Sequence, residues 1–125
     1  MKRCLVDTNV LIKMLEAPSS VSAFHRATLR RPGMTFHVST ASYWEIEIKR
    51  TIGKLNVAAA DVRTFCTEQG WREHPVDADI AIAAGQLPAH HGDPFDRAII
   101  ATAQILRLPV MTSDHAFANY GIETI

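Results

Sequence analysis

The sequence lacks the features that would place it at once in several large classes of protein. It has two cysteines, Cys4 and Cys66, which are too few for a disulfide framework in a chain of 125 residues. No apolar run approaches the roughly 20 residues that a membrane-spanning helix needs. The short apolar stretch near the N-terminus meets Asp7 at once, unlike the longer core of a signal peptide. We therefore expect a cytoplasmic protein with reduced, buried thiols.

An excess of charge of either sign is also absent, because 13 Lys and Arg residues balance 13 Asp and Glu residues. The whole molecule therefore has no net electrostatic attraction to nucleic acid, and any such binding has to be local, through a basic patch or bound metal ions. The six histidines show no structural zinc spacing. There is no GxSxG motif, glycine-rich phosphate loop or plausible Cys–His pair, so no side-chain nucleophile is evident.

What is present is an ordinary globular composition, 47% hydrophobic and 21% charged, which predicts a single domain over residues 1–125. Short apolar runs typical of strands alternate with helical patterns. This alternation predicts an α/β fold with a parallel sheet of about five strands, flanked by helices on both faces. The expected strands are 3–6, 36–38, 71–74, 109–111 and 122–125, and the expected helical segments are 10–16, 21–30, 40–52, 57–68, 77–87, 94–106 and 114–119.

Four acidic residues lie near the ends of these elements: Asp7, Glu45, Asp96 and Asp114. In open parallel sheets, ligands bind beyond the carboxyl ends of the strands, so all four could meet there. Each also has an ordinary explanation. Asp7 and Asp114 can be helix N-caps, Glu45 can form a capping box with Ser42, and Asp96 can complement a helix dipole.

Taken together, the four acids predict a metal site. Clustered carboxylates repel one another and are costly to desolvate, so a fold that gathers them needs cations. Oxygen ligands without nearby Cys or His zinc spacing favour Mg²⁺ or Mn²⁺, as one or two ions. The chemistry natural to such a site is phosphodiester hydrolysis by a metal-activated water.

At these residues the sequence resembles a known family. The segments LVDTNVLI, SYWEIEIKRTIGKL, LPAHHGDPFDRAIIATA and VMTSDHAF are similar to those of PIN-domain ribonucleases, and more narrowly to VapC toxins of bacterial VapBC toxin–antitoxin pairs. The resemblance extends from Leu5 to about Tyr120. It implies a PIN-like three-layer sandwich and a Mg- or Mn-dependent endoribonuclease acting as a toxin. It also implies a VapB-like antitoxin as partner and a homodimer that assembles further with that antitoxin.

The resemblance also implies roles for individual residues. Asp7, Glu45, Asp96 and Asp114 match the catalytic acids that bind the metal. His91 matches the histidine of the HGDPFDR motif, for which a structural hydrogen bond and an acid–base role both stay open. Residues expected to support the metal site from around it are Asn9, Thr112, Ser113, Asp93 and Arg97, with Asp93 as a cap of the helix that begins at Pro94 and Arg97 as a phosphate or carboxylate partner.

Basic residues near Glu45 are candidates for contact with RNA, namely Lys49, Arg50 and Lys54, with Lys13 and Arg97 as further candidates. Their alternative is an ordinary solvated helix end, where cations are favoured in any case. Trp44 and Trp71 are interpreted as core or interface residues rather than base-stacking platforms.

Two alternatives to a nuclease are considered. A phosphatase of the haloacid dehalogenase type would use Asp7 as its nucleophile, but Asn9 stands where that family usually has a second Asp. A non-catalytic module would keep the fold and bind RNA or a protein without turnover. The sequence does not name the RNA target.

Overall fold

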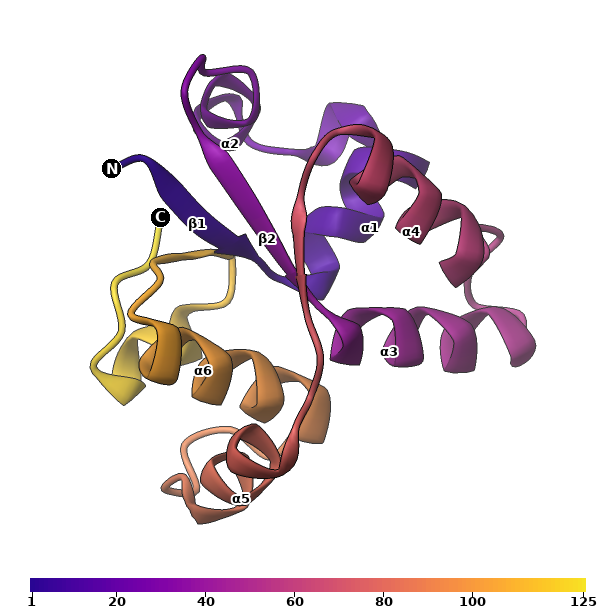
Figure 1. Ribbon diagram of the computed structural model, residues 1–125. Coiled ribbons are helices and arrows are strands. Elements are labelled where there is room, and N and C mark those ends of the chain that lie inside the picture. Colours follow the sequence, from indigo (N-terminus) through magenta and orange to yellow (C-terminus); the bar gives the residue numbers. More distant parts are fainter.

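The computed structural model describes residues 1–125 and shows a parallel four-stranded sheet with helices on both faces (Figure 1). This confirms the predicted α/β fold. In chain order the elements are β1 (Arg3–Val6), α1 (Thr8–Glu16), η1 (Pro18–Ser20), α2 (Ala23–Leu29), β2 (Thr35–Ser39), α3 (Thr40–Thr51), α4 (Ala59–Glu68), β3 (Arg72–His74), α5 (Ala78–Gln86), α6 (Pro94–Leu106), β4 (Val110–Met111) and η2 (His115–Tyr120), where η marks a 3₁₀ helix.

The strands lie in the order β3-β2-β1-β4, and every neighbouring pair is parallel. β1 is therefore central, with Leu5 in register with His37 on one side and with Val110 on the other. The expected fifth strand at 122–125 is reduced to a single bridge between Val110 and Thr124. β4, its partner, contains only two residues, which leaves few ladder positions for the C-terminal segment to extend.

Several helices begin at side chains that accept hydrogen bonds from their first turn. Asp7 caps α1, and Asp93 caps α6 ahead of Pro94, as the sequence predicts. The capping box expected between Ser42 and Glu45 is absent, because α3 begins earlier and its cap is Ser39. Ser42 instead lies inside the first turn of α3, which frees the Glu45 carboxylate for other contacts.

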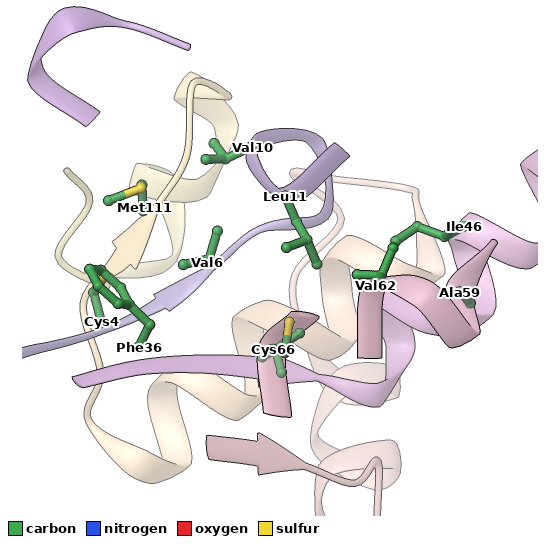
Figure 2. Close-up of a cluster of buried hydrophobic side chains, with 11 residues drawn as sticks. Cys4, Val6, Val10, Leu11, Phe36, Ile46, Ala59, Val62, Cys66 and Met111 are labelled. Atoms are coloured by element: carbon green, nitrogen blue, oxygen red, sulfur yellow. The ribbon is translucent and has the colours of Figure 1, made fainter. Parts of the chain in front are cut away.

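Alternating side chains of β1 enter two different parts of the core. Cys4 and Val6 face a cluster formed with α1, α3 and α4, in which Leu11, Ile46 and Val62 are fully buried (Figure 2). Leu5 points to the opposite face and packs against α6 and the C-terminal segment. Because successive side chains of a strand point to opposite faces, the burial of Cys4, Leu5 and Val6 in a row shows that β1 is covered on both faces.

The layers leave the carboxyl ends of the strands free to carry chemistry. β1 leads directly into α1 and β2 into α3, and α6 packs against α3 and α5. Both cysteines are buried and form no disulfide. None of the helices combines the length and the apolar character that crossing a bilayer requires.

Candidate metal centre

Asp7 leaves the carboxyl end of β1 and is almost entirely buried, with 2% of its surface exposed. Its Oδ1 accepts a hydrogen bond from the backbone N–H of Val10 at 2.8 Å, and its Oδ2 accepts one from the hydroxyl of Thr112. Burial raises the pKa of Asp7, and the nearby charge of Asp114 raises it further, while these two hydrogen bonds lower it. Capping and membership of the acidic cluster are therefore compatible roles of one carboxylate.

Asp114 follows β4 and is linked to the other acids through His91. Its Oδ1 caps η2 by accepting from the backbone N–H of Ala116 at 2.9 Å. Its Oδ2 lies 3.0 Å from Nε2 of His91, and the same nitrogen lies 2.9 Å from Oδ2 of Asp96. The histidine therefore joins the acid after β4 to the acid in the first turn of α6. Sequence reasoning left its role open, since its partner Asp114 is 23 residues away.

Asp96 shows the combined effect of burial and clustering. Burial, together with the charges of Asp93, Glu45 and Asp7 and against the opposing effect of His91, raises the pKa of Asp96 to about 7. The carboxylates of the four predicted acids are thus gathered at one end of the sheet and repel one another there. Their separation along the chain, from residue 7 to residue 114, is spanned by the parallel topology.

Glu45 has an unusual environment for a buried carboxylate. It lies one turn into α3 and is 6% exposed. Its Oε2 forms an ion pair with Nζ of Lys49 at 2.8 Å, but its Oε1 is buried without any hydrogen-bond partner. A buried, unpaired carboxylate oxygen is costly, so its presence beside other acids indicates a place for a cation.

The donor atoms fit a hard divalent ion. Ligand oxygens of Glu45, Asp93 and Asp96 lie within 4.8 Å of one another, and His91, Asp96 and Asp114 form a second such group. Asp96 belongs to both groups. Asp93 uses Oδ1 to accept from the backbone N–H groups of Phe95 and Asp96, as the expected cap. A set dominated by carboxylate oxygens is the kind that Mg²⁺ or Mn²⁺ prefers.

A cavity of about 600 Å³ opens beside Asp7 and Asp114, and its walls are partly basic. Lys13, Lys49 and Lys54 line it together with Asn9 and Ser113. Lys13 belongs to α1, two turns beyond Asp7, so the helix that Asp7 caps also supplies a cation to the cavity. The cavity is thus lined by both carboxylates and ammonium groups, and the ammonium groups suit a phosphate-bearing ligand.

Other expected contacts differ in the structure. Arg50 forms an ion pair with Glu47 and does not line the cavity. Arg97 donates to backbone carbonyls, including those of Leu87 at 2.7 Å and His91 at 3.0 Å, and so anchors the loop before α6 rather than a carboxylate. Trp71 packs against the core, but Trp44 is 66% exposed and is not a core residue.

Three hydroxyl groups support the site, one after β4 and two in the helices α1 and α3. The Thr112 hydroxyl donates to Asp7 and accepts from the backbone N–H of Asp114 at 3.0 Å, so it fixes both acids. The hydroxyls of Thr8 and Ser42 share a buried hydrogen bond of 2.8 Å that ties α1 to α3. The sequence pattern pointed to Thr112 but gave no signal for the Thr8–Ser42 pair, because it depends on a contact 34 residues apart.

The fold and this arrangement of acids define a recognised class. The chain belongs to the PIN domain family, whose model matches residues 4–123. Comparison with curated protein sequences gives no match.

Solved structures with the same fold come from toxin–antitoxin systems. FitAcB from Neisseria gonorrhoeae is similar at 22% identity with a TM-score of 0.69, over 98% of this chain and 96% of that one. VapBC2 from Rickettsia felis, bound to a promoter DNA fragment, matches at 13% identity and a TM-score of 0.68, over 98% and 97%. DNA-bound VapBC from Salmonella typhimurium matches at 19% identity and a TM-score of 0.66, over 100% and 98%. At these identities the similarity shows the fold.

Proposed function

We propose that this protein is a metal-dependent endoribonuclease that acts as the toxin of a toxin–antitoxin pair. The observation that carries the proposal is the gathering of Asp7, Glu45, Asp96 and Asp114 at one end of the sheet, with a buried oxygen of Glu45 left unpaired. Repulsion and burial make this cluster unfavourable by itself. A divalent cation would relieve both costs, which supports a metal centre as the purpose of the arrangement.

The residues suggest how such a site would work. Glu45, Asp93 and Asp96 would hold one Mg²⁺ or Mn²⁺ ion, and Asp7 and Asp114 lie beside them where they would complete a site for one or two ions. When bound, the ion lowers the pKa of a coordinated water and polarises the phosphate. Hydrolysis then adds a hydroxyl to phosphorus, breaks one P–O bond and returns a proton to the leaving ribose oxygen.

Lysine side chains would place the RNA over the acids. Lys13 and Lys54 line the cavity, and Lys49 lies beside Glu45 at its edge. Ammonium groups there would contact phosphates on either side of the bond to be cut, and they would offset repulsion between the nucleic acid and the carboxylates. RNA as the substrate follows from the similarity of the sequence to PIN-domain ribonucleases.

Partner proteins are proposed from two observations. The structural neighbours are toxin–antitoxin complexes, which supports a cognate VapB-like antitoxin that neutralises this chain. One side of α3, extended by its C-cap Ile52, carries an exposed apolar stripe at a spacing of four residues: Trp44, Ile48 and Ile52 are 66%, 40% and 61% exposed. Side chains four apart share one helix face, so this stripe suits burial in a homodimer.

The nuclease is tested with purified, antitoxin-free protein and total RNA from its own host. We expect cleavage with Mn²⁺ or Mg²⁺ and none in EDTA. Glu45→Gln and Asp96→Asn should each reduce the cleavage rate at least about 100-fold. Loss of a residue that only orients a metal ligand typically costs 10- to 100-fold, and loss of the ligand itself should cost more.

Asp79→Asn is the matched control, because Asp79 is an exposed acid in the first turn of α5. It should leave the rate unchanged. Full activity of Asp96→Asn, or equal activity in EDTA, would reject the proposed chemistry. Manganese binding without cleavage of any host RNA would favour a non-catalytic module.

The assembly is tested separately by light scattering of the purified chain. We expect a dimer for the wild type and a monomer for Trp44→Glu, since a charge in place of the largest side chain of the stripe opposes its burial. Phe24→Glu, at an exposed apolar residue of α2, is the control and should stay dimeric. Co-expression with the product of a small adjacent gene should give a stable complex that does not cleave RNA. A monomeric wild type would refute the homodimer alone.

A further inference from the structure

His91 lies at the centre of the acidic cluster, although it is not an acid. Its Nε2 is 2.9 Å from Oδ2 of Asp96 and 3.0 Å from Oδ2 of Asp114. Its Nδ1 is 3.1 Å from the backbone nitrogen of Asp93. A histidine beside two carboxylates admits three roles: a metal ligand, a general base, or a hydrogen-bond donor that holds the acids in place.

The contact with Asp93 decides among these roles. A backbone N–H can only donate, so Nδ1 of His91 accepts that bond with its lone pair and carries no proton. The single proton of the neutral ring is then on Nε2, the nitrogen that faces both carboxylates. A metal ligand or a general base would need a lone pair on Nε2, and this hydrogen-bond network gives that position an N–H instead.

The ring is held in this orientation by the loop that carries it. Arg97 donates to the backbone carbonyl of His91 at 3.0 Å and to that of Pro88 at 3.1 Å, which fixes the loop against the start of α6. The ring also packs against Phe117, with centroids 5.9 Å apart and ring planes at 81°. Rotating the ring to reverse its nitrogens would break the Asp93 contact and the link to both acids.

We propose that His91 is a positioning residue that donates its Nε2–H to Asp96 and Asp114 and holds them side by side for the metal, without ligating the ion. This inference rests on the proposed function, since it assigns these two acids to the metal site. An ionised carboxylate has about four lone-pair positions, so each acid can accept from His91 and still offer an oxygen to a cation. Outer groups of this kind orient ligands and set metal affinity.

Two substitutions separate the three roles. His91→Gln places an amide N–H at about the reach of Nε2, whereas the shorter side chain of His91→Asn ends near the position of Nδ1 and loses the donor. The probe is MnCl₂ alone, titrated by calorimetry into the full chain free of antitoxin. We expect His91→Asn to weaken Mn²⁺ binding about 10- to 100-fold, and His91→Gln to stay within a few-fold of wild type. His90→Asn is the control, because the neighbouring His90 contacts Tyr120 instead and should leave affinity unchanged.

Spectroscopy reads the role directly. With ¹⁵N-labelled histidine, NMR of the metal-free protein should show the His91 proton on Nε2, and electron spin-echo spectra of bound Mn²⁺ should show no coupling to imidazole nitrogen. A nitrogen coupling, or a Gln variant as weak as the Asn variant, would overturn the proposal. So would unchanged affinity in His91→Asn. If the wild type binds no Mn²⁺, the proposed metal-dependent function fails, but the NMR experiment still tests the role of His91. A proton on Nδ1 would then refute donation from Nε2.

Discussion

The two ends of the sheet carry opposite charges, although the chain as a whole is neutral. The carboxyl ends lead to Asp7 and Asp114, with the acids of α3 and α6 beside them. The amino ends form a pocket of about 360 Å³ without an acidic residue, lined by Lys2, Arg3, Arg72, His37, Thr35 and Gly33. A formal charge of zero therefore conceals a separation of charge along the strands.

The same physics shifts protonation in opposite senses at these ends. Burial and neighbouring acids raise the pKa of Asp96 to about 7. At the other end, burial and the neighbouring charges of His74, Arg3 and Arg72 lower the pKa of His37 to about 4. Each end suppresses its own charge, and at the acidic end Oε1 of Glu45 is also buried without a partner. A cation would stabilise the acidic end. At the amino end, the neutral rings of His37 and His74 already form a hydrogen bond, with Nδ1 of His37 2.6 Å from Nε2 of His74.

The largest effect is expected from the acidic end. Asp96 has a pKa of about 7 in the folded protein against 3.8 ordinarily, so folding binds a proton between these values. The contribution of Asp96 to the stability of the metal-free protein should therefore fall as the pH rises from about 4 to about 7, by about 4 kcal/mol at 1.36 kcal/mol per unit. Asp96→Asn should remove this contribution and so make the change of stability with pH more positive than in the wild type, as measured by urea unfolding in EDTA at several pH values.

Asp79→Asn provides the comparison for that experiment, because it removes an exposed acid from α5. It should keep the wild-type slope. Equal slopes in the wild type and Asp96→Asn would mean that the carboxyl end does not suppress charge. Saturating Mn²⁺ should reduce the wild-type slope, since a bound cation favours the ionised carboxylate.

The basic end should show a smaller effect of opposite sign. The lowered pKa of His37 means that the unfolded chain binds a proton below about 6.5, while the folded protein binds one only near 4. The contribution of His37 to stability should therefore be lost as the pH falls through this range, by up to about 3 kcal/mol. His37→Gln should flatten the acid limb of the unfolding curve. His90→Gln, at an exposed histidine, should leave that limb as it is.

The smallest effect compares lysines at the two ends. Lys13→Ala and Lys54→Ala should each raise the KM for RNA several-fold, and each should reduce the slope of log affinity against log salt by about 0.7, the value for one phosphate on a single strand. Lys2→Ala lies at the opposite end and should change neither quantity. An effect of Lys2 as large as that of Lys13 would place the RNA elsewhere on the molecule.

Much of this contrast was predictable from the sequence. The alternation of strands and helices predicts the parallel sheet. Because ligands bind beyond the carboxyl ends of such strands, it also predicts that Asp7 and Asp114 lie close together. The cap at Asp93 followed from local chemistry ahead of Pro94. These features depend on short-range pattern or on topology, which a single sequence carries.

Features that depend on distant partners were not predictable. The spacing of Ser42 and Glu45 predicts a capping box, but the Ser42 hydroxyl forms its hydrogen bond with Thr8 in another helix. Arg97 matched a phosphate or carboxylate partner, yet carbonyls of its own preceding loop surround it. Cations and hydroxyls have many possible partners, and only the folded geometry selects among them.

The most direct test of the metal centre is anomalous diffraction from crystals soaked in MnCl₂, with data collected at the manganese edge. We predict a peak among the carboxylates of Glu45, Asp93 and Asp96, on the side of the unpaired Glu45 oxygen, and its loss in Glu45→Gln. A fully soaked crystal with no peak at these acids would contradict it.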